Sequence, residues 1–185
     1  MMLTDGEISL RPRGPRDAFE LDWSGDAEAE RFGRDLEGSP WSQMWDRRRR
    51  QAFWVCVDDE VVGEADLFDI RRGDRTAELR IGLAPSALLG RGYGRRAVAL
   101  LLFYAYAHLQ LTSVYLRVRE SNARAVHCYL AAGFRRQGRL QGERFPDPIL
   151  LMHRDLTAEG VAQGLPGGAG PQEVRRQAAA GKLPR

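Results

Sequence analysis

Alternating apolar and polar positions predict several β-strands along the chain. Residues 77–83 and 114–119 alternate strictly between the two kinds of side chain, which is the pattern of a half-buried strand. A compact apolar run at 53–57 and a second run at 61–69 flank the polar turn 58–60 and predict a hairpin. Shorter runs at 8–11, from Phe134 onward and at 149–153 indicate further strands.

Two segments predict helices of different character. Residues 92–109 are apolar nearly all round beyond the first turn, which is typical of a helix buried inside a domain. Residues 122–132 form a second predicted helix, which Gly133 would end because glycine readily adopts the left-handed conformation. Asp17 is a candidate cap of a helix toward Trp23, and residues 24–50 are expected to hold short helices and loops. This order of elements predicts a mixed α/β sheet with the long helix on one face.

Composition changes near the C-terminus. From Thr157 onward glycine and proline are frequent and few large apolar residues remain, so this segment cannot bury enough surface to fold alone. The 185 residues are therefore interpreted as one domain over 1–156 and a disordered tail over 157–185.

Charge and cysteine content exclude several classes of protein. The net charge is +3, from 28 basic and 25 acidic residues, which is too balanced to indicate a nucleic-acid-binding protein. Cys56 and Cys128 form no C-x-x-C pair and no zinc-binding spacing, so no metal is expected. The first residues show neither a basic start nor an apolar core, and no apolar stretch is long enough to span a bilayer. We therefore expect a cytoplasmic protein without membrane contact.

A glycine-rich loop at residues 89–94 precedes the long predicted helix. Its sequence is Leu-Gly-Arg-Gly-Tyr-Gly, and glycines let a backbone turn tightly and come close to a ligand. The free N–H groups of a helix's first turn bind phosphate, and Arg91, Arg95 and Arg96 add positive charge there. The spacing fits neither a dinucleotide-binding G-x-G-x-x-G loop nor a P-loop. A tight turn without a ligand is the alternative.

Four segments taken together resemble a known superfamily. They are Ala77–Leu83, Gly90–Gly94, Asn122–Ala125 and Tyr129 with Gly133-Phe134. In this order they resemble the GCN5-related N-acetyltransferases (GNAT), and look closest to the branch of ribosomal-protein N-terminal alanine acetyltransferases. The resemblance is strong over 76–156, looser over 8–75 and absent from the tail. It implies an α/β (α+β) fold whose mixed, mostly antiparallel sheet has splayed fourth and fifth strands and flanking helices.

The resemblance also implies a binding site for acetyl-CoA as co-substrate. The pyrophosphate would lie on the backbone N–H groups of 91–95 and the pantetheine beside 81–83, with a backbone N–H near Leu83 facing the oxyanion. The implied coenzyme-binding residues are Ile81, Gly82, Leu83, Leu89, Gly90, Arg91, Gly92, Tyr93, Gly94, Arg95 and Asn122. Leu89 departs from the superfamily pattern, which usually has Gln or Arg there. Asn122 is also well suited to cap the following helix, and both roles are compatible.

Two residues are candidates for proton transfer. By resemblance, Tyr129 would give a proton to the departing thiolate, whereas the alternative is a packed helical tyrosine. Glu78 would accept a proton from the amine, since a primary amine is mostly protonated at pH 7. The alternative for Glu78 is an ion pair with Arg80 or Arg117. Glu143 is a weaker candidate base.

The acceptor is less defined than the coenzyme. The branch resemblance favours a protein or peptide N-terminus, and a polyamine, amino acid or aminoglycoside is the alternative within the same chemistry. Acidic residues over 26–37 would attract a cationic amine or form a solvated helical face. A non-catalytic acyl-CoA-binding module is the competing class. Dimers are common among similar proteins, and the predicted strand at Ile149–His153 is a candidate edge for pairing in a homodimer.

Overall fold

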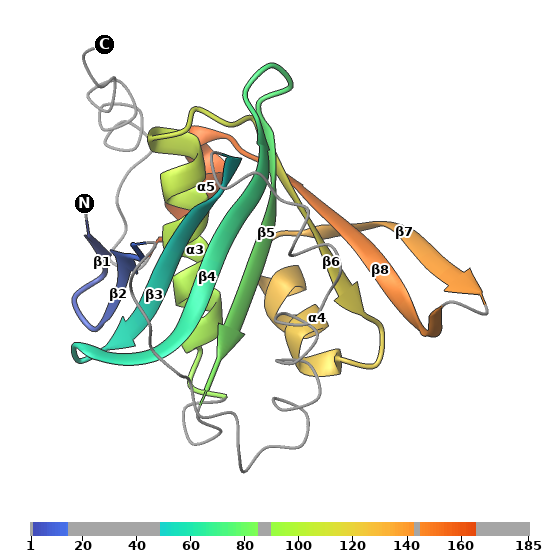
Figure 1. Cartoon of the computed structure of the whole chain (residues 1–185), viewed down its shortest axis with the longest axis horizontal. Coiled ribbons are helices and arrows are strands. Elements are labelled where there is room, and N and C mark those ends of the chain that lie inside the picture. Colours follow the sequence, from blue (N-terminus) through green and yellow to red (C-terminus); the bar gives the residue numbers. More distant parts are fainter. Residues whose placement is uncertain (1, 15–48, 85–89, 143–144, 166–185) are drawn as a thin grey trace.

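One mixed sheet dominates the computed structural model, which describes residues 2–14, 49–84, 90–142 and 145–165. In this part of the chain eight strands lie in the order β1-β2-β3-β4-β5-β6-β8-β7 (Figure 1). The strands are β1 (Leu3–Thr4), β2 (Ile8–Pro12), β3 (Gln51–Val57), β4 (Glu60–Arg71), β5 (Thr76–Leu83), β6 (Ser113–Arg119), β7 (Arg135–Gly142) and β8 (Phe145–Asp155). The described helices are α3 (Tyr93–Ala107), α4 (Ala123–Ala131) and α5 (Ala158–Gly164). The predicted α/β class is confirmed.

The strand pairing is antiparallel everywhere except between β5 and β6. These two strands run parallel and pair only over Thr76–Glu78 and Ser113–Tyr115, although β5 continues to Leu83 and β6 to Arg119. Beyond the paired section they diverge, and α4 is visible in the opening between them (Figure 1). The predicted splay between the fourth and fifth strands of the expected order is therefore confirmed.

The hairpin of β3 and β4 follows from its turn residues. Asp58 and Asp59 have φ angles of 49° and 66°. Two successive positive φ angles characterise the turn whose twist matches that of the flanking strands, and aspartate tolerates this conformation. The expected hairpin over 53–69 is confirmed, with both strands longer than predicted.

The long helix α3 packs its apolar surface against one face of the sheet. Ala97, Leu101 and Ala105 are fully buried in one core cluster with alternate residues of the strands, such as Val55 and Leu79. The second predicted helix is α4, and Gly133 follows it with φ +83°, as expected for a glycine that ends a helix.

Helix α5 corrects the expected start of the tail. It occupies residues that the composition assigned to a disordered segment, and Ala158, Val161 and Ala162 are buried in the core. Thr157 caps it by accepting a hydrogen bond from the N–H of Gly160 (3.0 Å), and Arg154 donates to the Gly160 carbonyl (2.6 Å). The ordered region therefore reaches Leu165 at least. The residues on the buried face of this helix are small and bury little area each. Amino-acid composition alone therefore did not reveal the helix. Residues 166–185 lie outside the described part.

The sheet edge is not where the sequence suggested. Ile149–His153 belong to β8, which pairs with β6 on one side and β7 on the other, so the edge strand is β7, whose residues are all exposed. The elements expected over 17–48 lie outside the described residues. Within the described ranges, no helix combines the length and apolar character needed to cross a membrane.

Candidate active site

The glycine loop leaves the start of α3 open. Gly90 and Gly92 have φ angles of +79° and +81°, which side-chain-bearing residues rarely adopt. Gly92 is the N-cap of α3, so no side chain caps the helix, and the first turn contains no acidic residue. Within the described part of the chain, the N–H groups of the first turn therefore have no side-chain cap and can meet an anion at the positive end of the helix dipole. Phosphate binding at this helix start stays a prediction. Leu89 lies outside the described residues.

Three elements meet at Gly94. A β-carbon added to Gly94 would lie 3.5 Å from the sulfur of Cys128 on α4 and 3.6 Å from a methyl group of Leu83 on β5. The structure thus brings the glycine loop, the end of β5 and helix α4 to one place, although they are distant in sequence.

The strand β5 is open on the side that faces this junction. Ile81, Gly82 and Leu83 pair with β4 on one edge, while β6 has already diverged on the other. Backbone N–H and C=O groups on such an edge can pair with an amide-bearing ligand. The arrangement fits the pantetheine arm of acetyl-CoA.

Gly63 on β4 is a further constraint that the sequence reading missed. A β-carbon there would lie 2.3 Å from the Gly82 carbonyl oxygen and 2.6 Å from a Leu83 methyl group. No side chain fits without moving β5. An isolated glycine inside a strand pattern can signal such close approach.

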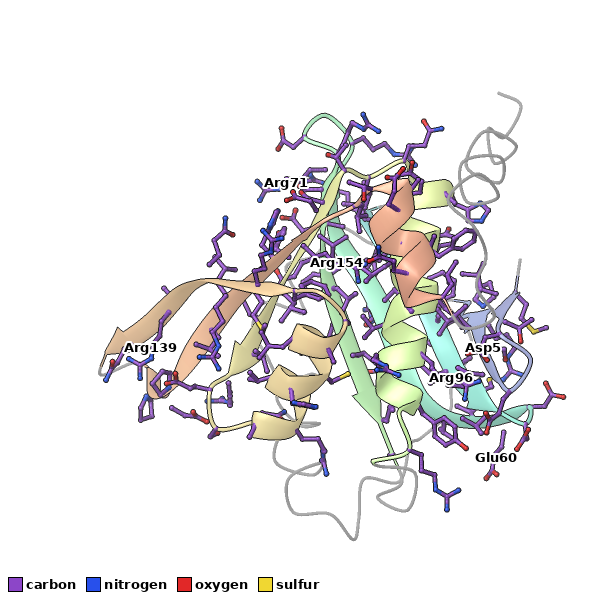
Figure 2. The ribbon with its side chains drawn as sticks, turned by 180° about the vertical axis from the view of Figure 1, so that it is seen from behind. Asp5, Glu60, Arg71, Arg96, Arg139 and Arg154 are labelled. Atoms are coloured by element: carbon purple, nitrogen blue, oxygen red, sulfur yellow. The ribbon has the colours of Figure 1, made fainter. Side chains whose placement is uncertain are left out.

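Two residues of the first turn of α3 have partners away from the expected ligand. Arg96 was expected to add charge to the phosphate site, but its guanidinium binds the Asp5 carboxylate through Nε (2.7 Å) and Nη2 (2.8 Å) and also reaches Glu7. The Tyr93 hydroxyl donates to Glu7 (2.8 Å). Figure 2 shows Arg96 and Asp5 together beside α3. These bonds fasten the turn between β1 and β2 to the helix, whereas Arg91 and Arg95 are exposed at its start.

Asn122 caps helix α4. Its side-chain oxygen accepts a hydrogen bond from the Ala125 N–H (3.1 Å). The capping alternative is therefore confirmed. Because the cap uses the oxygen, the side-chain NH2 group keeps its two donors for another partner.

Glu78 is buried and forms an ion pair with Arg117. Its side chain is only 5% exposed, and each carboxylate oxygen accepts one bond from the guanidinium, at 2.7 and 2.8 Å. Of the two partners considered, Arg117 is the one that binds Glu78, whereas Arg80 binds Asp66. Burial raises the pKa of Glu78, and the hydrogen bonds and charge of Arg117 counteract part of that rise. Glu143 lies outside the described residues.

Tyr129 lies on α4 and is 6% exposed, with its ring edge-on to Phe134 at 5.9 Å between centroids. Burial, together with the neighbouring Cys128 thiol, raises the pKa of Tyr129. The hydroxyl therefore stays protonated at neutral pH, which a general acid requires. Burial also raises the pKa of Cys128, to about 11, so this thiol is not a nucleophile at pH 7.

The two candidates for proton transfer lie on different faces of the sheet. Tyr129 belongs to the core cluster that contains α3. The same cluster contains Ala77 and Leu79, so strand alternation places Glu78, which lies between them in sequence, on the opposite face of the sheet. The roles of Glu78 and Tyr129 in proton transfer stay predictions.

Comparison with known proteins agrees with this arrangement. The family model of the acetyltransferase (GNAT) domain matches residues 7–135. A spermidine N(1)-acetyltransferase of Escherichia coli (strain K12) is 32% identical over 108 residues, which are 56% of this chain and 58% of that protein. One from Vibrio cholerae is 35% identical over 100 residues, 54% and 57% of the two chains. The match thus spans less than two thirds of these relatives.

A solved structure extends the likeness to most of the chain. It is a chimera of the Vibrio cholerae spermidine N-acetyltransferase and hSSAT, with a TM-score of 0.62, 26% identity, and coverage of 80% of this chain and 94% of that one. This chain belongs to the GNAT acetyltransferase family. The narrower likeness to ribosomal-protein alanine acetyltransferases is not confirmed, because the relatives found are spermidine acetyltransferases.

Proposed function

We propose that this chain is an acetyl-CoA-dependent N-acetyltransferase that acts on a small primary amine. The observation that carries the proposal is the junction of the open start of α3 with the free edge of β5. Family membership supports the use of acetyl-CoA, and the spermidine N-acetyltransferases among the relatives support a small amine as acceptor.

Each part of the coenzyme has a matching feature in this junction. The backbone of residues 91–95, with the side chains of Arg91 and Arg95, would hold the pyrophosphate. The backbone of 81–83 would pair with the pantetheine, and an N–H near Leu83 would stabilise the oxyanion. The NH2 group of Asn122, which the cap does not use, would contribute a donor at the start of α4.

The reaction needs two proton transfers. Acetyl-CoA supplies a thioester, whose C–S bond breaks as the amine nitrogen forms the amide bond. The ammonium form of the substrate first loses one proton to solvent, and Glu78 then accepts, directly or through one water, the proton that the nitrogen loses as the neutral amine becomes the amide. Tyr129 gives its hydroxyl proton to the departing sulfur and regains one from solvent, so charges and protons balance over the cycle. A non-catalytic module would bind the coenzyme without needing either residue.

The acceptor is a small amine in this proposal, and a peptide N-terminus is the alternative. Three carboxylates on the face that carries Glu78 are bound by arginines: Glu64 by Arg13, Asp66 by Arg50 and Arg80, and Glu78 by Arg117. The acidic residues of 26–37 lie outside the described part.

A homodimer and a cytoplasmic location remain predictions.

Thermal unfolding with and without acetyl-CoA, followed by thiol release on a panel of amines, tests the function. A ligand that binds only the folded state raises the unfolding midpoint. We expect a rise with acetyl-CoA and the fastest thiol release with spermidine, compared with an amino acid, an aminoglycoside and a peptide with a free N-terminus. Tyr129→Phe should keep the rise in midpoint and release thiol about 100-fold more slowly.

Each outcome has a definite meaning. Fastest release with the peptide would replace the small amine by a protein N-terminus. A shift in midpoint without thiol release from any amine would favour the binding module. The absence of any shift at millimolar acetyl-CoA would refute the proposal as a whole.

A further inference from the structure

The ion pair of Glu78 and Arg117 lies where β5 and β6 part. The last paired residues of the two strands are Glu78 and Tyr115, and Arg117 is two positions further along β6 on the same face. The guanidinium therefore bridges the strands just beyond their last contact. At this point backbone hydrogen bonds no longer hold the strands together, so a side-chain bridge fixes how the two strands begin to diverge.

The bridge leaves Glu78 capacity to accept a proton. A carboxylate has about four lone-pair positions on its two oxygens. Arg117 uses one on each oxygen, through Nε and Nη2. The remaining positions can accept a bond from an amine or from one water. Because both oxygens are fixed by a planar fork, these positions have a defined direction.

Within the described residues, other charged or titratable groups act on Glu78 from its own strand and from the two strands beside it. They are Arg80 on β5, Asp69 on β4 and the hydroxyl of Tyr115 on β6. Asp66 binds Arg80 at 2.7 Å, and Asp69 accepts a bond from Tyr115 at 3.0 Å. Among the described residues, Arg117 is thus the cation that contacts the Glu78 carboxylate, and it opposes the burial that favours the neutral acid.

We propose that Arg117 is a positioning residue, which keeps Glu78 ionised and aimed as the proton acceptor for the substrate amine. The proposal rests on the proposed acetyltransferase function. As the amine nitrogen forms its bond to the acetyl carbon, its proton passes to Glu78. The neutral acid then returns that proton to solvent. Arg117 touches neither the amine nor the coenzyme in this scheme, and acts through the carboxylate alone.

The pH profile of kcat tests the role of Arg117. In Arg117→Met a buried carboxyl loses its cation, so its pKa rises and the acidic limb of the profile should move up by about one pH unit or more. At pH values below the wild-type limb kcat should therefore fall about tenfold, with the KM for acetyl-CoA changed less than about threefold. Arg117→Lys keeps the positive charge but not the planar guanidinium. It should move the acidic limb of the pH profile part of the way back to its wild-type position. Arg136→Met, on the exposed strand β7, is the matched control and should behave as wild type.

A double variant distinguishes loss of the proposed role of Arg117 from misfolding. Arg117→Met leaves a buried carboxylate without its partner, whereas Glu78→Gln with Arg117→Met removes both charges. Glu78→Gln alone should abolish the acidic limb, and adding Arg117→Met should then change kcat little, because the two residues act as one unit.

Three results would overturn the inference. One is an acidic limb that stays in place in folded Arg117→Met. Another is an effect confined to the KM for acetyl-CoA, which would show that the ion pair only holds the two strands together. The third is simple additivity of the two substitutions. These differ from failure of the proposed function, in which the wild-type protein itself releases no thiol.

Discussion

The first turns of α3 and α4 differ in whether a side chain binds their free N–H groups. Every helix begins with N–H groups that have no partner within the helix. At α4 the side chain of Asn122 accepts one of them. At α3 the cap is Gly92, which has no side chain to offer, and the first turn carries Tyr93, Gly94 and Arg95 without any acid. The start of α3 packs against the second half of α4, since Gly94 approaches Cys128.

The capped start of α4 contributes to the stability of the fold, whereas the uncapped start of α3 is proposed to bind a ligand. An uncapped helix start costs stability, which a bound anion would restore. The start of α3 is instead held by side chains, because Arg96 and Tyr93 bind Asp5 and Glu7 in the turn between β1 and β2. We call these bonds the lateral fastening of α3. The helix is thereby held without covering its N–H groups. Substitutions at the two helix starts test this separation.

Reversing the charge at the open start should have the largest effect. In the double variant Arg91→Glu, Arg95→Glu, two anions replace two cations where the pyrophosphate is proposed to bind. We expect the Kd for acetyl-CoA to rise about 100-fold, roughly tenfold for each reversal, with little change in stability. Isothermal calorimetry measures it. The same reversal at Arg135 and Arg136 on β7 is the control, and equal weakening by both pairs would remove the special role of the α3 start.

Removing the lateral fastening should mainly affect stability. Arg96→Met leaves Asp5, whose side chain is 1% exposed, without its cation, and we expect a loss of about 2 kcal/mol in the free energy of unfolding. Arg95→Met, one residue earlier, should lose affinity for acetyl-CoA but not stability. Urea unfolding of both variants checks this. Stability that is unaffected by Arg96→Met would contradict the role of the fastening.

The pH dependence of the same fastening has a definite sign. Burial alone would raise the pKa of Asp5, but hydrogen bonds from Arg96 and from backbone N–H groups outweigh it and lower the pKa. A carboxyl with a lowered folded-state pKa stabilises the protein above its unfolded pKa, near pH 4, and loses this contribution as the pH falls further. The difference between wild type and Arg96→Met should therefore shrink below about pH 4.

The cap of α4 should show the smallest effect. Asn122→Ala removes the bond to the Ala125 N–H and should cost about 1 kcal/mol in stability. Asn122→Asp keeps the capping oxygen but loses the NH2 donors, so stability should be retained while affinity for acetyl-CoA falls. If Asn122→Asp binds acetyl-CoA as wild type does, Asn122 is a cap only and the contrast between the two helix starts becomes sharper.

Local patterns were enough to predict most of the elements and the glycine loop. The strict alternation of 77–83 and 114–119 identifies two strands, because side chains of a strand point to opposite faces in turn. The positive φ angles of Gly90, Gly92 and Gly133 occur at glycines that the sequence marked as turns or ends. Helix α5 escaped prediction, since its buried residues are small and stand among glycines.

Partners of charged side chains were not predictable in the same way. Glu78 was open to an ion pair with Arg80 on its own strand or with Arg117 on another, and only the parallel register of β5 with β6 selects Arg117. Likewise, Arg96 directly follows Arg95 just beyond the glycine loop, so the sequence grouped it with the arginines expected at the phosphate. Its partner Asp5 is 91 residues away, and that contact exists only because the turn before β2 packs beside α3.

The sequence by itself determined most of the described elements, the open helix start and the resemblance to one superfamily, because these depend on periodicity and on backbone preferences within a few residues. The tertiary structure alone decided the edge strand, the closeness of Gly63 to β5, and which arginine holds Glu78. These features depend on strand order and register, which bring together residues far apart in the chain and which no local pattern encodes.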